Sequence, residues 1–371
     1  MQTADVVVIG GGIVGASVAF GLANLGLKPL LLDEGDNAFR ASRGNFGLVW
    51  VQGKGLDCPE YAQWSRHSAG LWPGFARDLH ERTGVDTGYE RPGGVLLHMS
   101  AEEAHRSEAA LAEIRRQCGD RPYEYEILDR MQLAEMLPGL GPTVYNGAYS
   151  PREGHVNPLY LMRALHTAML GLGGAYRPDH RVDRIAREAG GYVVHSSGGM
   201  FSTARVVICA GLDTRRLAAQ VGLDAPVRAI AGQVAVSERA AVTLPMPTNL
   251  VRQTREGSLM VGFTVDDLGL DTTTRVDRTR NIAALAVRAF PWLGDLRLVR
   301  SWACLRIMTG DGFPIYDEAP GFPGVHVVTC HSGITLAAAH ALEIAPWIAG
   351  RSPAAGQERF STGRFDVQAH R

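Results

Sequence analysis

Three glycines near the start of the chain have the spacing that can hold a pyrophosphate. They follow the apolar run 6–9 and open a segment in which Val14, Val18, Leu22 and Leu25 recur at helical spacing. In such a turn the first glycine allows a tight bend, the second lets the backbone approach a phosphate, and the third lets helix and strand pack closely. The helix N-terminus adds unpaired N–H groups. The segment predicts a dinucleotide site formed by Gly10, Gly12, Ile13, Val14 and Gly15.

An acidic residue stands where such a site needs one. The second apolar run, 30–32, ends at Asp33, and Glu34 follows. A carboxylate at this strand end can accept hydrogen bonds from ribose hydroxyls. A merely structural turn is the alternative reading, but the strand, helix, second strand and terminal acid together favour dinucleotide binding.

The loop after Asp33 is rich in glycine and small polar residues. Such a loop can be purely structural, yet its position lets it run back over a bound cofactor. Ser42, Gly44, Asn45 and Gly47 suit close contact with a flat ring system.

Composition excludes several classes of partner. The 371 residues are 46% apolar and contain 37 basic and 38 acidic side chains without long runs of one sign. Nucleic acid and acidic membrane surfaces are therefore poor candidate partners. No apolar run is long enough to span a membrane, and the five scattered cysteines predict neither a disulfide frame nor a metal site. We expect a cytoplasmic enzyme without a leader segment.

The pattern of elements predicts an α/β fold with a Rossmann-like nucleotide-binding domain and a second α+β domain built on a largely antiparallel sheet. Expected helices are 61–79, 100–117 behind a capping box at Ser100 and Glu103, 158–172 behind the N-cap Asn157, 279–290, and 334–345 up to Pro346. The first domain is expected to comprise residues 1–80, 151–225 and 303–371, and the substrate domain residues 81–150 and 226–302. The last twenty residues are expected to form a loosely held tail.

Two later segments are expected to return to the nucleotide. Val182 and the turn Ala210-Gly211 follow strand-like runs and can bracket the adenosine half. A third return ends in the buried strand 325–330 and the turn that begins at His331.

Six separated motifs resemble one family. GGGIVG (10–15) with Asp33, GHVNP (154–158), VVICAG (206–211), WACLR (302–306), DGFPI (311–315) and HSGITLA (331–337) occur in the order and spacing of the FAD-dependent amine oxidoreductases. That superfamily includes D-amino-acid oxidase, glycine oxidase and sarcosine oxidase. RQT (252–254), LRIMTGDGFPIYDE (305–318) and TCHSGITLAAAHA (329–341) look closest to the flavin subunits of opine and D-hydroxyproline dehydrogenases.

The resemblance implies a role for each matched position. Besides the glycine fingerprint and Asp33, it implies contacts to the pyrophosphate and isoalloxazine from Ser42, Arg43, Asn45, Phe46, Gly47 and Leu48. It implies adenosine contacts from Val182 and Gly211. It also places the turn Ser332, Gly333, Ile334, Thr335 and Leu336 at the flavin pyrimidine ring, where a helix N-terminus favours the negative charge of the reduced flavin.

The resemblance further implies the chemistry. Arg306 would hold the substrate carboxylate through a bidentate pair, and a hydride would pass from the substrate Cα to flavin N5 and leave an imine. The structural alternative for Arg306 is an ordinary salt bridge. His331 would tune the flavin or the amine proton, and its alternative is a simple hydrogen-bonding role.

Two positions depart from the family pattern. Cys304 replaces a common glycine, and in monomeric sarcosine oxidases a cysteine at this place binds the flavin covalently. We expect non-covalent FAD, because a thiol reacts only as thiolate and nothing near Cys304 in the sequence activates it. Cys330 stands where many oxidases have glycine, which weakens the inference of an oxidase.

Three alternatives to a free-standing amino-acid or imino-acid oxidoreductase remain. The chain can be a subunit of a larger opine or D-hydroxyproline dehydrogenase that passes electrons to a partner redox subunit. It can oxidise a hydroxy acid, although no base is obviously placed for a hydroxyl proton. A plain NAD-dependent dehydrogenase leaves VVICAG (206–211) and the turn at His331 without a role.

Overall fold

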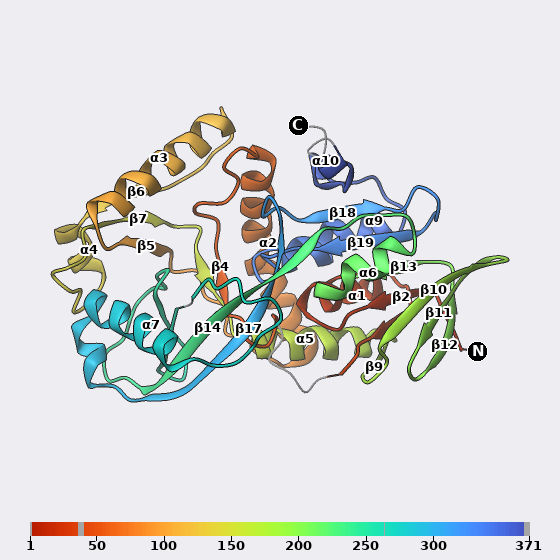
Figure 1. The fold of residues 1–371 in the computed structure, drawn as a ribbon, viewed down its shortest axis with the longest axis horizontal. Helices are drawn as coiled ribbons and strands as arrows, with labels where there is room; N and C mark the ends of the chain where they lie inside the picture. Colours follow the sequence, from red (N-terminus) through yellow and green to blue (C-terminus); the bar gives the residue numbers. More distant parts are fainter. Residues whose placement is uncertain (1, 36–40, 263, 367–371) are drawn as a thin grey trace.

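A computed structural model describes residues 2–35, 41–262 and 264–366. Figure 1 shows two lobes: α3, α4, α7 and β5–β7 lie at one end, β10–β13 and β2 lie toward the other, and β14 and β17 run between them. This is an α/β fold with the expected two kinds of sheet.

The sheet that contains the first strand of the glycine turn has six members in the order β18-β19-β13-β2-β3-β9. All neighbours pair in parallel except β18 and β19 at one edge. Its inner strands are buried on both faces, which explains why they appear in the sequence as continuous apolar runs. Their bounds are β2 (Val6–Ile9), β3 (Pro29–Leu32), β9 (Ala175–Arg177), β13 (Val206–Ile208), β18 (Ile315–Glu318) and β19 (Val325–Thr329).

Helices α1, α2 and α5 cover one face of this sheet together with the C-terminal helical run. Their side chains share one core with Val6, Val8 and Leu31. Asn157 caps α5 as expected, because its side chain accepts the N–H groups of Leu159 and Tyr160. The bounds are α1 (Ile13–Asn24), α2 (Pro59–Thr83) and α5 (Pro158–Gly171).

The C-terminal helical run differs from the expected helix 334–345. It begins with α8 (Ala337–Ala339), widens into a π-helical turn, η3 (His340–Ile344), and continues as α9 (Ala345–Ile348). Pro346 therefore does not end the run. Proline has no N–H and clashes with the carbonyl four residues earlier, and the wide turn before Pro346 accommodates that defect.

A four-stranded sheet, β1-β12-β11-β10, lies beside the nucleotide-binding lobe. Two hairpin connections join β10 to β11 and β11 to β12, while β1 pairs with β12 in parallel. The bounds are β1 (Gln2–Ala4), β10 (Val182–Glu188), β11 (Gly191–Ser196) and β12 (Gly199–Thr203), and η1 (Gly211–Asp213) and α6 (Thr214–Ala219) follow β13.

The second lobe is built on antiparallel strands. One sheet has the order β15-β16-β14-β17 and another the order β5-β7-β6, and their apolar faces share a core that includes Val95, Leu97, Val251 and Leu259. The bounds are β5 (Gly94–His98), β6 (Glu126–Asp129), β7 (Asn146–Ser150), β14 (Val227–Arg239), β15 (Val251–Gln253), β16 (Ser258–Val261), β17 (Leu298–Thr309), α3 (Ala101–Cys118), α4 (Arg130–Met136), α7 (Val276–Ala289) and η2 (Pro291–Asp295).

Strand β17 connects the two lobes. It pairs with β14 from Leu298 to Thr309, so it runs without interruption across residues 302 and 303, where a domain boundary was expected. Side chains two residues apart on a strand share a face. Trp302, Cys304 and Arg306 therefore lie on one face of β17.

The expectation of a loose tail is wrong for the part of the chain that the structure describes. Phe360, in η4 (Gln357–Phe360), is 1% exposed and packs its ring near Tyr61 and Tyr316. Arg364, in α10 (Gly363–Asp366), forms an ion pair with Asp311 at 2.7 Å. Neither contact can be inferred from the polar composition of the tail.

Candidate functional site

The glycine turn brings three segments of backbone into contact. Gly10 has φ of +107°, and a Cβ atom built there would lie 2.3 Å from the carbonyl oxygen of Cys209. A Cβ on Gly15 would lie 1.9 Å from the carbonyl oxygen of Gly10. Neither position has room for a side chain, so strand β2, helix α1 and the end of β13 meet as the fingerprint requires.

Side chains expected at the phosphates and ribose surround this turn. Asp33 accepts the N–H groups of Gly11, at 2.7 Å, and Gly35, at 3.0 Å. Ser42 Oγ accepts the N–H of Ile13, the first residue of α1, at 3.0 Å. Both side chains remain half-buried, and the start of the 42–48 loop therefore lies at the N-terminus of α1.

The residues expected at adenosine are brought together in part. The main chain of Asp33 exchanges hydrogen bonds with residues 177 and 180, just before Val182. The carbonyl of Val182 accepts from Arg216 at 2.7 Å, and the exposed Glu34 pairs with Arg181 at 3.6 Å. Ala210 lies against Gly10, whereas a Cβ on Gly211 would touch Ile307 on β17.

The loop 44–48 packs against β17. The carbonyl of Gly44 accepts from the Trp302 ring N–H at 3.0 Å and from the Cys304 thiol at 3.5 Å. A Cβ on Gly44 would lie 2.7 Å from Cys304 Cβ.

Asn45 accepts the N–H of Gly47 at 2.7 Å and so shapes the turn. Leu48 is the first residue of β4 (Leu48–Val49), which pairs with β8 (Gly154–His155). At the other end of the loop, Arg43 is half-buried.

Arg252, which sequence reasoning treated only as part of a motif, supports this loop. It is 3% exposed, and its Nε donates to the carbonyl of Phe46. Burial lowers the pKa of Arg252 to about 10. A Cβ on Gly47 would lie 2.8 Å from the Arg252 guanidinium, so this glycine allows the close contact.

The turn that begins at His331 is fixed by helix α2. Tyr61 shares a hydrogen bond with Ser332 at 2.8 Å. The carbonyl of Thr335 accepts from Ser68 at 2.7 Å and from the Trp72 ring N–H at 3.0 Å. These three α2 residues are all buried. Gly333 lies near Val14 of α1, since an added Cβ would be 3.3 Å from the Val14 side chain.

The same turn leaves donors available. Among the described residues, no acceptor is found for the N–H groups of Gly333, Ile334 and Thr335, whereas the N–H of Leu336 bonds to the carbonyl of Ser332. Unpaired N–H groups at the start of a helical run favour an anion or a carbonyl oxygen.

Arg306 projects from β17 over its neighbouring strand β14. Its guanidinium donates to the carbonyls of Ala231, at 3.2 Å, and Thr264, at 2.7 Å. A Cβ on Gly232 would lie 2.3 Å from an Arg306 nitrogen, so Gly232 provides the space for the guanidinium. Burial lowers the pKa of Arg306, while Cys304 and Asp266 oppose that shift.

His331 lies within reach of two positive charges. Burial, followed by the charges of Lys54 and Arg306, lowers the pKa of His331 to about 4. The side chain is nevertheless exposed by surface area. At neutral pH the imidazole is uncharged.

Lys54 and Glu153 were missed by sequence reasoning, which had no local pattern to find them. Lys54 Nζ donates to Thr335 Oγ1 at 3.0 Å. Glu153 is fully buried and accepts the N–H groups of Val51 and Gln52, both at 2.8 Å. Burial lowers the pKa of Lys54 to about 8 and raises the pKa of Glu153 to about 8, while each group's charge opposes the other's shift.

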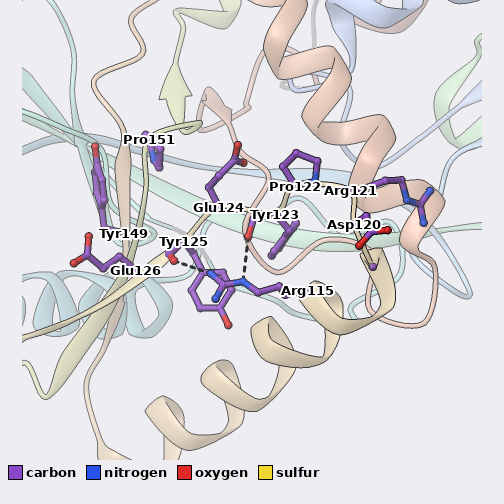
Figure 2. A pocket seen from close by; sticks show the side chains of 11 residues that line it. Arg115, Asp120, Arg121, Pro122, Tyr123, Glu124, Tyr125, Glu126, Tyr149 and Pro151 are labelled. Carbon is purple, nitrogen blue, oxygen red and sulfur yellow. Dashed lines mark hydrogen bonds between the residues drawn. The ribbon is translucent and has the colours of Figure 1, made fainter.

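A recess of about 580 Å³ lies elsewhere, beside α3 and the strand β6. Figure 2 shows its lining side chains, among which Arg115 donates to the carbonyls of Tyr123 and Tyr125. Arg115 also lies 3.8 Å over the Tyr125 ring, so internal contacts already engage this cation. None of the expected cofactor or substrate residues lines this recess, and its volume alone does not make it the site.

These features define a dinucleotide-binding oxidoreductase in which a second sheet faces the cofactor domain. The chain belongs to the FAD dependent oxidoreductase family, whose pattern matches residues 5–347. It is 41% identical to a subunit of opine oxidase from Rhizobium meliloti and 42% identical to the protein of the same name from Agrobacterium tumefaciens (strain Ach5), in each case over 99% of both chains. The crystal structure of glycine oxidase from Geobacillus kaustophilus superposes with a TM-score of 0.87 at 26% identity and covers 98% of this chain and 99% of that one.

The expected family, fold class and cofactor are thereby confirmed. The residues of this structure also fit FAD, because Gly10 and Gly15 leave no room for side chains beside the N-terminus of α1 and, within the described ranges, the turn 333–335 offers three unpaired N–H groups. Burial raises the pKa of the Cys304 thiol, which keeps it protonated and gives no support to a covalent link.

Within the described residues, no helix is both long and apolar enough to cross a bilayer. Within the same ranges, no cluster of three potential metal ligands is found.

Proposed function

We propose that this protein oxidises an amino or imino acid, at a site between the turn 331–335 and the face of β17 that carries Arg306. The observation that supports the proposal is the pair of cations near the turn 331–335: Lys54 donates to Thr335 Oγ1 at 3.0 Å, and, besides burial, the charges of Lys54 and Arg306 both lower the pKa of His331. A substrate with a carboxylate and an amine suits such a site, since the cations bind the anion and no positive charge on the histidine opposes the amine.

Each residue of the site has a defined task in this proposal. Arg306 binds the substrate carboxylate through its planar fork. His331 accepts or donates a hydrogen bond as a neutral imidazole. The N–H groups of Gly333, Ile334 and Thr335 bind the cofactor end where charge develops. FAD, when bound, supplies the ring that accepts a hydride from the substrate Cα, and the resulting substrate imine hydrolyses in water.

The cofactor contacts that the sequence predicts are part of the same proposal. We infer that Gly10, Gly12 and Gly15 with Asp33 hold the ADP part, and that Ser42 and the loop 43–48 pass along the pyrophosphate to the ring. We also retain the division into an FAD-binding domain (1–80, 151–225 and 303–371) and a substrate domain (81–150 and 226–302), in which β17 belongs to both.

We further propose that the chain works as one component of a larger enzyme. Two relatives, at 41% and 42% identity, carry the name of an opine oxidase subunit, which supports a partner chain that receives electrons. A cytoplasmic location is part of the same proposal and is supported by five buried cysteines, all free.

The test is an anaerobic absorbance titration of the purified holoprotein with D-amino acids, proline derivatives, N-methylglycine and opines. We expect at least one amine to bleach the flavin band, and the rate at which the band returns in air separates an oxidase from a dehydrogenase. If a hydroxy acid bleaches the flavin and no amine does, the proposed substrate class is wrong.

The proposal of a partner chain has a separate test. The chain is mixed with an artificial electron acceptor and, in parallel, with oxygen alone. Turnover with the artificial acceptor but not with oxygen supports a partner that receives electrons, whereas equal turnover with oxygen contradicts it.

A further inference from the structure

Arg252 carries a buried positive charge that has no carboxylate partner in the described part of the chain. The residue is 3% exposed. Its Nε donates to the carbonyl of Phe46 and its Nη2 donates to the Met260 sulfur at 2.8 Å, while Nη1 has no partner within the same ranges. A carbonyl is a neutral acceptor and a thioether a weak one. Neither contact neutralises the guanidinium.

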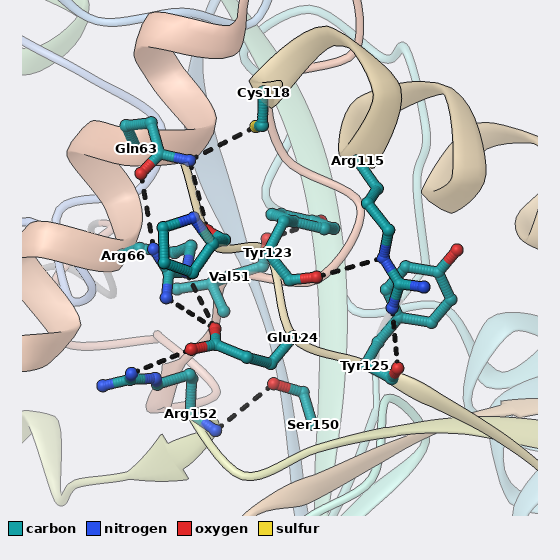
Figure 3. Close-up of polar contacts among 11 residues, drawn as sticks. Val51, Gln63, Arg66, Arg115, Cys118, Tyr123, Glu124, Tyr125, Ser150 and Arg152 are labelled. Carbon is teal, nitrogen blue, oxygen red and sulfur yellow. Dashed lines mark hydrogen bonds and ion pairs between the residues drawn. The ribbon is translucent and has the colours of Figure 1, made fainter. Parts of the chain in front are cut away.

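Two other arginines with little exposure are paired. The side chain of Arg66 is 11% exposed and lies 2.5 Å from Glu124, which also binds Arg152 at 2.9 Å. Figure 3 shows Glu124 between these two arginines. The side chain of Arg364 is 13% exposed and pairs with Asp311 at 2.7 Å. An unpaired guanidinium is costly to bury, so the contrast with Arg252 calls for a counter-ion.

A recess of about 90 Å³, called the Arg252 recess below, is lined by Arg252, Thr254 and His155 among others. The Thr254 hydroxyl is buried and finds no hydrogen-bond partner in the described residues. His155 is 8% exposed, and its contact with Glu90, at 3.8 Å, is too long for a hydrogen bond. Three incompletely satisfied polar side chains therefore border one space.

The carboxylates at the rim of the Arg252 recess are engaged or exposed. Asp86 forms an ion pair with Arg255 and accepts the N–H of Gly88 at 2.8 Å. Glu256 is exposed, and its charge only opposes the effect of burial, which lowers the pKa of Arg252 to about 10. Arg252 therefore stays positively charged at neutral pH.

His155 is uncharged at the same pH. Burial, followed by the charges of Arg252 and Arg255, lowers the pKa of His155 to about 3. A neutral imidazole still has one N–H donor. The Arg252 recess thus combines a guanidinium with a hydroxyl and an imidazole that can each donate a hydrogen bond.

The volume of the recess restricts its ligand. One water molecule needs about 10–15 Å³ of such space, whereas pockets for drug-sized ligands have about 300–1,000 Å³. The recess therefore holds a few waters or one small ion. Water can satisfy Thr254 and His155, but it cannot neutralise Arg252. A planar oxyanion accepts hydrogen bonds from all three groups and supplies the missing negative charge.

We propose that the Arg252 recess binds a small carboxylate ion from solution, held by Arg252, Thr254 and His155. This site is separate from the proposed substrate site, because neither Arg306 nor His331 lines it. Arg252 also binds the carbonyl of Phe46. The ion consequently fixes the guanidinium that supports the loop 44–48.

The experiment uses formate as the probe. The midpoint of urea unfolding is measured at pH 7 with FAD in fixed excess, while formate replaces chloride at constant ionic strength. Stabilisation that depends on formate concentration gives the dissociation constant. The central variant is Thr254→Val, because the hydroxyl it removes has no partner in the described chain and its loss does not weaken the fold. Thr274→Val, at an exposed position, is the matched control.

Two further variants locate the ion. Arg252→Met removes the charge that binds it, and Arg306→Met removes the cation of the proposed substrate site, where a carboxylate can also bind. We expect formate to stabilise the wild type and Arg306→Met alike and to leave Arg252→Met unchanged. If Arg252→Met does not fold, the comparison of Thr254→Val with the wild type still decides.

In Thr254→Val the dissociation constant of formate is expected to rise by about tenfold or more, which corresponds to about 1.4 kcal/mol for a lost hydrogen bond to a charged group. The unfolding midpoint without formate stays equal to that of the wild type or rises. In Thr274→Val the dissociation constant stays within about twofold of the wild-type value.

Three results would overturn the inference. The first is a wild type that formate stabilises no more than chloride does. The second is the same dissociation constant in Thr254→Val and the wild type. The third is an effect of formate that disappears in Arg306→Met and persists in Thr254→Val, which assigns the ion to the substrate site. None of these results contradicts the proposed function, which the bleaching of the flavin by an amine tests separately.

Discussion

The two halves of the site are built by different kinds of contact. At the dinucleotide end, backbone touches backbone: Gly10 lies against Cys209, and Gly15 lies against Gly10. At the substrate end, side chains join segments far apart in the sequence. Trp50 and Thr335, which share a hydrogen bond, are 285 residues apart, and Ser68 and Thr335 are 267 residues apart.

This difference explains which half can be recognised in a sequence. A backbone contact requires glycine at a fixed spacing, and only a few residues satisfy it. A side-chain contact across the fold can be made by many residue pairs, so neither partner is marked locally. The predictions below disturb each half in turn, from the largest expected effect to the smallest.

Adding a methyl group at Gly15 is expected to abolish FAD binding. A Cβ there would lie 1.9 Å from the Gly10 carbonyl oxygen, so β2 and α1 must separate. We expect Gly15→Ala to weaken FAD binding by at least about 100-fold, or about 2.8 kcal/mol. The measurement is the ratio of flavin to protein after dialysis against known FAD concentrations.

Gly70→Ala is the matched control. Gly70 is exposed in α2 and has open space around it, so alanine there fits the helix. Full flavin occupancy in Gly15→Ala would show that the glycine contact does not govern cofactor binding.

Removing the charge of Arg306 is expected to impair the substrate end alone. Arg306→Met loses the carboxylate partner, and kcat/KM for the amine identified in the titration should fall by about 100-fold or more. Flavin content should stay unchanged. Steady-state kinetics and the absorbance ratio test both points.

The control for this variant is Arg228→Met on the neighbouring strand. Arg228 is exposed and pairs with Asp267 at 2.6 Å, an interaction that contributes about 1 kcal/mol or less. An equal fall in kcat/KM for both variants would argue against a substrate role for Arg306.

Replacing Glu153 is expected to change stability and its dependence on pH. Both oxygens of Glu153 accept backbone N–H groups, and glutamine can accept only one of them, so Glu153→Gln should lower the free energy of unfolding by about 1–3 kcal/mol at pH 5. The native pKa of Glu153 is raised to about 8 from 4.5. Between these values the native state keeps a proton that the unfolded state has lost, so this carboxyl lowers wild-type stability as pH rises.

Urea unfolding at pH 5 and pH 7.5 measures both effects. The fall attributable to Glu153, up to about 1.4 kcal/mol per pH unit, should be absent in Glu153→Gln. Glu135→Gln, an exposed substitution in α4, serves as the control. Identical pH slopes in Glu153→Gln and the wild type would contradict the raised pKa.

The smallest effect is expected at Cys304. Its thiol is buried and protonated, and it contacts the Gly44 carbonyl. Cys304→Ser should keep full flavin content, and acid precipitation should release FAD from both proteins. Flavin that stays with the precipitated wild type but not with Cys304→Ser would establish a covalent link.

The sequence alone determined the family, the cofactor and the order of the main elements. The glycine turn, Asp33 and the buried parallel strands obey local rules of spacing and hydrophobicity, and those rules do not depend on the rest of the fold. The capping residues Ser100 and Asn157 were identified for the same reason, since a cap and its helix are neighbours in the chain.

Only the tertiary structure decided the remaining features. Phe360 lies in the core although its segment is polar, because Tyr61 and Tyr316 from distant elements enclose it. Lys54 meets Thr335 only once Ser68 and Trp72 of α2 have bound the turn that contains Thr335. Such contacts depend on the three-dimensional approach of residues hundreds of positions apart, and no periodicity in the sequence records that approach.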